Sequence, residues 1–509
     1  MTFRSLLWDE ASAPTSRPGE PECFGDLHLD QVVAEVVRGR EDYDLAPLLH
    51  QPLGDPAMIA GRQRVFSDLE DDDVAQAVST FSERMRRMRR YQGLARRRHQ
   101  AEERQRWFLD AAQVYLDAVR GLRDALAAHE LGSEGLQALR DHLDALIASS
   151  SFAALARDAA AVAEALDEVR YAIAIKGRRV RVRHYEGEPD YLAEIEEAFA
   201  KFRERDAKDY RAQLPPESQM NGVEERILGL VAQLFPETFG QLTTFTERHA
   251  DFADPGVLTF EREAQLFLGY RKHVRALRNA GLPFCYPTVT PGARTVTIED
   301  GFDLALARKL ASQGTVPVTN SLRLGPGERV AVITGPNQGG KTTFARMVGQ
   351  IHHLAALGLP VPGRRVEVGL ADQVLTHFER EESLDTLRGK LEDDLTRIRG
   401  ILDRATADSV LVLNELFTST TVSDAVALGH DILERIRGLG ALCLYVTFLD
   451  ELAEAGPETV SLVGEVSPED PTARTFEIVR RPADGLAYAA ALAQRHRLTY
   501  DHVRERLRA

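Results

Sequence analysis

The sequence is poor in the residues that cross-link small extracellular proteins and in the apolar runs that cross membranes. Its 3 cysteines, Cys23, Cys285 and Cys443, are odd in number and far apart, which argues against a disulfide framework and a zinc cluster. The longest strongly apolar stretch, residues 439–449, is too short to span a bilayer. The N-terminus has acidic residues where a signal peptide has its apolar run. We therefore predict a cytoplasmic protein of a reducing compartment, with no membrane partner.

Positive charge is also scarce, and lysine especially so. The chain has 78 acidic against 63 basic residues and a formal net charge of −15. This balance argues against a protein that coats nucleic acid by bulk charge, although a local basic patch can still bind it. The sequence contains seven lysines, one of which, Lys341, lies in its strongest motif. With 44% hydrophobic residues, the 509 residues are enough for roughly three globular domains.

The residue pattern divides the chain into a helical part and an α/β part. Residues 57–170 are rich in alanine and leucine, which predicts long helices. Residues 173–183 alternate β-branched and basic side chains, which predicts a short strand or hairpin with one cationic face. A further helix is expected over residues 260–280. After Tyr286-Pro287, short apolar strands alternate with amphipathic helices, which is typical of a parallel sheet.

A phosphate-binding motif, G-x-x-x-x-G-K-[ST], lies between a predicted strand at residues 329–334 and a predicted helix at residues 342–356. Backbone amides of such a loop converge on phosphate oxygens, and the helix N-terminus favours negative charge. Lys341 would neutralise the β- and γ-phosphates of ATP, and the Thr342 hydroxyl would bind Mg²⁺. The alternative, a chance glycine-rich turn, is disfavoured by the flanking elements and the scarce lysine. The predicted phosphate-binding residues are Gly335, Pro336, Asn337, Gln338, Gly339, Gly340, Lys341, Thr342 and Thr343.

A second polar site follows the apolar strand predicted at residues 409–413, which ends in Asn414 and Glu415. A carboxylate at the C-terminal edge of such a strand lies beside a γ-phosphate, so Glu415 is the candidate general base or orienter of the attacking water. The alternative is a solvated acid at a strand end. Asn414 is placed for the Mg²⁺ shell, but as a neutral amide it brings no charge to the ion. We predict an ATPase with a weakened metal shell.

These residues resemble the MutS family of DNA mismatch-repair ATPases. The loop G-P-N-Q-G-G-K-T has the family's form of the motif, and similarity runs through residues 318–489. Residues 44–69 and 260–289 resemble parts of the family's helical lever more weakly. The family's mismatch-recognition domain has no counterpart in the sequence, so we expect recognition of DNA structure and not of a mispair.

The resemblance implies a multidomain fold, mainly α-helical at first and ending in an α/β P-loop ATPase domain of the ABC type. The expected parts are a loose leader at 1–22, a helical core or lever at 23–170, a reduced clamp-like insertion at 171–255, a returning lever helix and linker at 256–290, and the MutS-like ATPase domain at 291–509.

The resemblance implies roles for further residues. Asn320 stands where the family has an asparagine on the adenine nucleotide side of the site. Thr420, Thr421 and Asp424 stand in the family's signature loop, which completes the site of the neighbouring subunit and so implies a homodimer. The alternative for residues 418–421 is a polar helix cap, and the two roles can coexist. Phe448 replaces a histidine of the family.

Two basic segments are candidates for DNA contact. The strand at the place of the family's clamp carries Lys176, Arg178, Arg179, Arg181 and Arg183. Residues 84–106 contain ten arginines, for which a solvated or ion-paired helix face is the alternative. His352 and His353 have no acid or cysteine at ligand spacing, so we interpret them as a surface and a core residue and not as metal ligands.

Together, the residues and the resemblance predict an ATP-dependent DNA-binding protein of the MutS type. With ATP and Mg²⁺ as cofactors, it would couple ATP binding and hydrolysis to clamping on duplex or branched DNA in repair or recombination. The alternative is a nucleotide-gated protein-binding scaffold with little or no ATP hydrolysis.

Overall fold

The computed structural model describes residues 3–8, 19–177, 179–187, 220–379, 389–467, 469, 473–483, 498–500, 504 and 506. The chain divides into two compact units. Unit 1 comprises Met1–Thr2, Gln76–Glu130 and Leu139–Glu261, and unit 2 comprises Phe3–Ala75, Leu131–Ala138 and Arg262–Ala509. The domain boundaries expected from the sequence stay a prediction.

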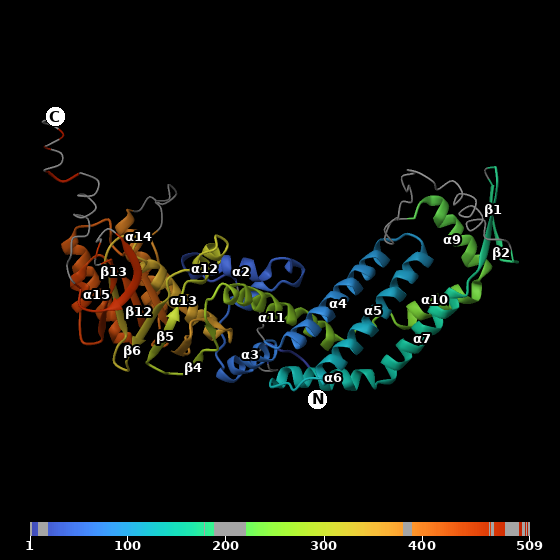
Figure 1. Cartoon of the computed structure of the whole chain (residues 1–509), viewed down its shortest axis with the longest axis horizontal. Helices are drawn as coiled ribbons and strands as arrows, with labels where there is room; N and C mark the ends of the chain where they lie inside the picture. Colours follow the sequence, from blue (N-terminus) through green and yellow to red (C-terminus); the bar gives the residue numbers. More distant parts are fainter. Residues whose placement is uncertain are drawn as a thin grey trace. The chain divides into compact units, whose positions relative to one another are not determined.

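Unit 1 is built from long helices and one hairpin (Figure 1). α5 buries apolar side chains every three or four residues along one face, and its Tyr115 packs against Phe152 and Phe252. The long helices and the strands predicted from the sequence are confirmed. The elements are α4 (Asp72–Arg97), α5 (Ala101–Ala127), α7 (Ser150–Asp167), β1 (Tyr171–Lys176), β2 (Arg179–His184), α9 (Gly222–Leu234) and α10 (Pro236–Arg248), with α4, α6 (Glu134–Ile147) and α11 (Pro255–Asn279) shared between the units.

Taken one at a time, the helices of the described residues are too short or too polar to cross a membrane. α6 and α7, bent by 60° at the break between them, reach the necessary length and composition only as a pair.

Unit 2 is organised around a six-stranded sheet with the strand order β10-β11-β12-β7-β13-β14. The first five strands are parallel, and β14 runs antiparallel to β13 at one edge. Strands β7, β11 and β12 are buried throughout, as expected for parallel strands with both faces covered. The strands are β7 (Val330–Thr334), β10 (Val374–His377), β11 (Val410–Asn414), β12 (Leu442–Val446), β13 (Thr459–Val466) and β14 (Arg474–Arg480).

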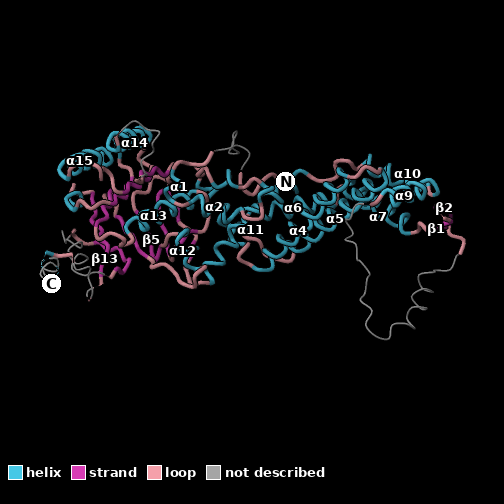
Figure 2. The backbone as a smooth tube through the Cα atoms, turned by 90° about the horizontal axis from the view of Figure 1, so that it is seen from above, coloured by secondary structure: helices cyan, strands magenta, loops and turns pink. Residues whose placement is uncertain are grey.

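Helices cover this sheet. Ile398 of α14 (Lys390–Arg404) and Leu433 of α15 (Val422–Leu439) join the core formed by alternate residues of β7, β11 and β12. Figure 2 shows α14 and α15 along one side of the strands. Gly349 of α13 (Lys341–Ala356) lies against Val412 of β11. The residues before and after Val412 in this strand face the α14–α15 core. The parallel sheet predicted from the strand and helix alternation is thus confirmed for five of its strands.

Smaller elements complete unit 2. A four-stranded sheet has the order β4-β9-β5-β6, and a two-stranded sheet pairs β3 with β8. These strands are β3 (Phe284–Cys285), β4 (Thr288–Thr290), β5 (Val296–Gly301), β6 (Asn320–Leu324), β8 (Val361–Pro362) and β9 (Arg365–Gly369). The remaining helices are α1 (Cys23–Leu27), α2 (Leu29–Val37), α3 (Pro56–Asp68), α12 (Leu304–Ala311) and the short 3₁₀ helices η1 (Glu41–Tyr43), η2 (Ala46–Leu49) and η3 (Asp450–Glu454).

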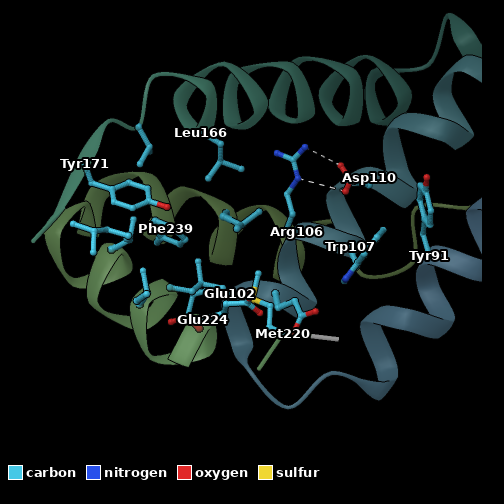
Figure 3. A pocket seen from close by; sticks show the side chains of 17 residues that line it. Tyr91, Glu102, Arg106, Trp107, Asp110, Leu166, Tyr171, Met220, Glu224 and Phe239 are labelled. Carbon is cyan, nitrogen blue, oxygen red and sulfur yellow. Dashed lines mark hydrogen bonds and ion pairs between the residues drawn. The ribbon is translucent and has the colours of Figure 1, made fainter. Parts of the chain in front are cut away.

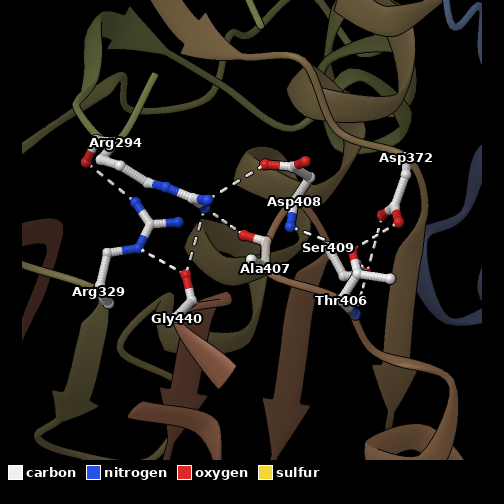
Figure 4. Close-up of polar contacts among 8 residues, drawn as sticks. All are labelled: Arg294, Arg329, Asp372, Thr406, Ala407, Asp408, Ser409 and Gly440. Atoms are coloured by element: carbon white, nitrogen blue, oxygen red, sulfur yellow. Dashed lines mark hydrogen bonds and ion pairs between the residues drawn. The ribbon is translucent and has the colours of Figure 1, made fainter. Parts of the chain in front are cut away.

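Two arginines secure the amino ends of the central strands (Figure 4). Arg329 donates hydrogen bonds to the carbonyl oxygens of Gly440, at 3.1 Å, and Arg294, at 2.9 Å. Arg294 in turn donates to the carbonyl oxygen of Ala407 and lies 3.4 Å from Asp408. Gly440 is the C-cap of α15, so the Arg329 guanidinium satisfies a carbonyl group at the negative end of that helix. These contacts hold the amino ends of the strands. The candidate site described below lies at the opposite, carboxyl ends.

Residues 3–8, which belong to the leader expected at residues 1–22, are packed within unit 2. Phe3, Leu6 and Leu7 are buried, and the buried carboxylate of Glu263 accepts hydrogen bonds from Ser5 and from the backbone of Leu6. Apolar burial and a buried acceptor together hold this segment, and neither is visible in its proline-rich sequence context. Residues 9–18 lie outside the described part of the chain.

Candidate functional site

The glycine-rich loop joins β7 to α13, and two positions in it require glycine. Gly335 has a φ of 118°, and a Cβ there would lie 2.9 Å from the backbone nitrogen of Gly464 on β13. Gly340 has a φ of 90° and is the N-cap of α13. A larger residue at either position would strain the backbone, and at Gly335 it would also collide with β13. The predicted strand, loop and helix are confirmed, with the helix starting one residue earlier than expected.

Lys341 is held inside the loop. Its side chain is buried, and Nζ donates hydrogen bonds to the carbonyl oxygens of Gly335, at 2.9 Å, and Pro336, at 3.0 Å. Nζ also lies 4.4 Å from the centroid of the Phe448 ring. Burial lowers the pKa of Lys341 to about 8, although the nearby Glu415 carboxylate acts in the opposite direction. The loop thus contains a cation with few water contacts.

The end of β11 meets the start of α13. Because β7, β12 and β11 are parallel neighbours, their carboxyl ends lie at one edge of the sheet. There the Thr342 hydroxyl donates a hydrogen bond of 2.8 Å to Oδ1 of the buried Asn414. The structure therefore brings together the two residues predicted from separate motifs to bind Mg²⁺.

Glu415 follows Asn414 in a left-handed conformation with a φ of 55°. Its backbone nitrogen donates to the carbonyl oxygen of Val446 on β12, at 2.9 Å, which fixes the turn. Partial burial raises the pKa of the Glu415 carboxyl, while the Lys341 ammonium opposes the rise. A carboxylate with a raised pKa is better suited to accept a proton near neutral pH.

A cavity of about 880 Å³ lies in front of these groups. Its lining includes residues 337–343 and Glu415, together with the Phe448 ring. Its apolar lining residues include Phe302, Leu306, Leu310, Val316, Val318, Met347 and Phe476, and the polar residues Asp303 and Asn320 also line it. A cavity of this size, with both polar and apolar lining residues, suits a small molecule that combines an anionic group with a flat ring.

Asn320 lines the cavity, and its side-chain amide also forms hydrogen bonds to a neighbouring strand. Its Nδ2 donates to the carbonyl oxygen of Phe476 at 3.1 Å, and its Oδ1 accepts from the backbone nitrogen of Ile478 at 2.7 Å. Asn320 thus joins β6 to β14 and holds the backbone of Phe476, which has a φ of 63°. The sequence analysis missed Phe476 because no local pattern links it to the loop.

Thr420, Thr421 and Asp424 form the cap of α15. The Thr421 hydroxyl accepts a hydrogen bond from the Asp424 backbone at 3.2 Å and donates one to its carboxylate at 2.8 Å. Thr420 lies 3.5 Å from the same carboxylate. The cap alternative is therefore confirmed. These residues do not line the cavity of their own chain, and their contribution to a neighbouring subunit stays a prediction.

Comparison with known proteins identifies the region that contains the site. Residues 331–468 match the family model described as MutS domain V. The C-terminal region of the chain belongs to the MutS family. The DNA mismatch repair protein MutS of Chlorobium phaeobacteroides is 31% identical over 172 residues, which cover 34% of this chain and 20% of that protein. Msh3 of Mus musculus is 31% identical over 181 residues, 35% of this chain and 16% of that protein.

MutS of Synechococcus sp. is 29% identical over 176 residues, 34% of this chain and 19% of the relative. The matched segments therefore span a fifth or less of the curated relatives. The resemblance expected from the loop motif is confirmed for this region.

Outside the MutS-family region, β1 and β2 form an antiparallel hairpin with two different faces. Cross-strand partners share a face, so Ala172–Arg183, Ala174–Arg181 and Lys176–Arg179 lie on one side, and Tyr171–His184, Ile173–Val182 and Ile175–Val180 lie on the other. The cations of the first face are exposed. The single cationic face predicted from the alternation is confirmed. Arg178 lies outside the described residues.

The apolar face of the hairpin borders a second cavity, of about 780 Å³, within unit 1 (Figure 3). Tyr171 contributes to it together with Trp107 of α5 and Phe239 of α10. Several carboxylates line it, and Arg106 is paired with Asp110 at 3.1 Å. Carboxylates repel phosphates, so the cationic face is the side of the hairpin suited to a nucleic-acid backbone.

The arginines of residues 84–106 are partly engaged within unit 1. Arg84 donates to the carbonyl oxygen of Asp117 at 2.9 Å, Arg89 pairs with the buried Glu261, and Arg98 lies 2.8 Å from Glu103. These contacts favour the ion-paired helix face over DNA binding for this segment.

Proposed function

We propose that the protein binds ATP with Mg²⁺ at the cavity in front of residues 335–343 and hydrolyses it there. One observation carries the proposal: Lys341, Thr342 and Glu415 line a single cavity, and Thr342 Oγ1 lies 2.8 Å from Oδ1 of the buried Asn414 behind it. A cation for the phosphates, oxygen donors for Mg²⁺ and a carboxylate for the attacking water are groups that sites of ATP hydrolysis use.

The role of each residue follows from its chemistry. Lys341 brings positive charge to the β- and γ-phosphates, and the N-terminus of α13 adds its dipole. The hydroxyl of Thr342 and the amide oxygen of Asn414 fit Mg²⁺, which prefers oxygen donors. Bound there, the ion would neutralise charge that develops on the phosphates. Glu415 accepts the proton of the attacking water or orients that water.

The cationic face of the β1–β2 hairpin is the proposed DNA-binding surface. Exposed guanidinium and ammonium groups contact phosphates and carry little base information, which supports duplex or branched DNA as the ligand. The relatives are named DNA mismatch repair proteins, which supports a role in repair or recombination. In the proposed homodimer, Thr420, Thr421 and Asp424 would complete the partner's site.

The test of the proposal is ATP turnover by the purified protein with and without branched DNA. Lys341→Ala is expected to abolish ATP binding, because the phosphates lose their buried cation. Glu415→Ala is expected to bind ATP and lose turnover, because the water is no longer activated. A wild type that turns over ATP no faster than Glu415→Ala would contradict hydrolysis at this site.

A nucleotide-gated protein-binding scaffold is the second candidate, and the neutral side chain of Asn414 favours it. Without a carboxylate in the metal shell, the site would bind ATP but hydrolyse it very slowly. Salt dependence separates the two candidates, because contacts to several DNA phosphates weaken steeply as salt rises. If no duplex or branched DNA binds with salt-sensitive affinity, the DNA-clamping function is wrong and the scaffold is favoured.

A further inference from the structure

The Phe448 ring lies against the one buried cation of the candidate site. Nζ of Lys341 is 4.4 Å from the ring centroid, a distance at which the negative face of an aromatic ring attracts an ammonium group. Both residues line the cavity. Two of the three ammonium donors are used by the carbonyl oxygens of Gly335 and Pro336. The ring is therefore an additional partner of a cation that is already bonded within its own loop.

The backbone around Phe448 is fixed, while its ring is half in solvent. β12 is buried up to Val446, and the next residue, Thr447, is 3% exposed and donates its backbone N–H to Ile333 on β7 at 3.1 Å. The Thr447 hydroxyl accepts a hydrogen bond from Leu449 at 3.1 Å. The Phe448 side chain is 46% exposed. Because Phe448 is only about half buried, its ring can rotate away from Lys341 without opening the core.

A polyphosphate group needs the ammonium that the ring covers. An aromatic ring offers no hydrogen bond to a phosphate oxygen, and a phosphate cannot occupy the same side of Nζ as the ring. The backbone amide of Glu415 is bonded to Val446, so the Glu415 turn and the Phe448 turn follow neighbouring strands at this end of the cavity. The ring therefore lies beside Lys341, just after the strand next to the one that leads to Glu415.

We propose that Phe448 is a positioning residue that covers the Lys341 ammonium, so that a nucleoside polyphosphate must displace the ring in order to bind. This role presupposes the nucleotide site proposed above and adds to it a determinant of affinity. Removing the ring face while keeping an apolar side chain, as in Phe448→Leu, strengthens polyphosphate binding. Phe448→Tyr keeps the ring face and the wild-type affinity.

The cover is tested first without any nucleotide, by limited acylation of the lysines and mass spectrometry. Three of the other six lysines provide internal references, since Lys176, Lys272 and Lys309 are exposed. Lys341 is expected to react slowly in the wild type and in Phe448→Tyr and faster in Phe448→Leu, with the reference lysines unchanged. Unchanged references also show that the variant is folded. Equal reactivity of Lys341 in all three proteins would overturn the proposal.

Affinity for ATP and for inorganic tripolyphosphate is then measured by calorimetry in the presence of Mg²⁺. Phe448→Leu is expected to bind both about fivefold more tightly than the wild type, which corresponds to the loss of one cation–π contact. Weaker or equal binding by Phe448→Leu would overturn the proposal. If neither the wild type nor either variant binds ATP while the acylation pattern holds, the nucleotide site is wrong and the cover of Lys341 by Phe448 stands.

Discussion

The Thr342 hydroxyl donates a hydrogen bond of 2.8 Å to the side-chain oxygen of Asn414. The first residue belongs to the helix that follows β7, and the second ends β11, with β12 between the two strands. This contact places a hydroxyl and an amide oxygen where the proposed Mg²⁺ would lie, but it supplies no negative charge. We therefore expect a low affinity of this pair for Mg²⁺, which can be measured directly.

Replacing Asn414 with aspartate is expected to raise the affinity for Mg²⁺ in the presence of ATP. The change keeps the side-chain length and the oxygen that faces Thr342, and it adds a negative charge to the proposed metal shell. The measurement is a Mg²⁺ titration of ATP binding or turnover. Asn414→Ala is the matched control and should weaken the response. Identical titrations for wild type and Asn414→Asp would show that Asn414 lies outside the metal shell.

Neutralising the hairpin is expected to weaken DNA binding and its dependence on salt. Arg179 and Arg181 are exposed on the cationic face, so the double change to glutamine should lower the slope of log affinity against log salt by about 2 if each contacts one phosphate. The matched control is the same double change at Arg86 and Arg87, which are exposed on α4. Equal losses in both variants would contradict a specific role for the hairpin.

Removing the helix cap of α15 is expected to lower stability. Thr421 accepts a hydrogen bond from the Asp424 backbone at 3.2 Å, and loss of such a cap costs about 1 kcal/mol. Thr421→Ala should therefore lower the free energy of unfolding in urea, whereas Thr421→Ser should preserve it. An alanine variant as stable as the wild type would mean that the cap contributes nothing.

The protein is expected to lose stability as the pH falls from about 6.5 to about 4. Burial lowers the pKa of His352 and of His353 to about 4, while an unfolded histidine titrates near 6.5. Between these values the unfolded chain binds more protons than the folded one, so the free energy of unfolding decreases as the pH falls and levels off below about 4.

The measurement is urea unfolding at several pH values. Glutamine has no titratable group, so a His352→Gln, His353→Gln double variant should show a shallower dependence on pH than the wild type. Parallel curves for the two proteins would mean that these histidines do not titrate with unfolding.

Much of the candidate site could be predicted because its signals are local. The strand, glycine-rich loop and helix around Lys341 are encoded within a short segment, and the apolar strand before Asn414 ends at the residue expected. The cationic face of the hairpin was also predictable, because side chains alternate between the faces of a strand. In each case the information lies in the order of neighbouring residues.

Other features were missed because they depend on contacts between distant segments. His352 and His353 were expected to be one surface and one core residue, yet both are buried, since η2 covers His353 and its Nε2 bonds the carbonyl oxygen of Leu49 at 2.9 Å. The hydrogen bonds between the Asn320 side chain and the backbone of β14 likewise join strands that are far apart in the chain.

Three features follow from the sequence alone: the scarcity of lysine, the phosphate-binding motif and the two different faces of the hairpin. Composition and periodicity do not depend on how the chain packs. Only the tertiary structure decided which groups surround Lys341. Parallel strands bring Glu415 and Phe448 to the same edge of the sheet as the loop. Burial then lowers the pKa of the Lys341 ammonium and leaves the Phe448 ring as its cover, because the position of a side chain in the cavity is set by the whole sheet and not by its neighbours in sequence.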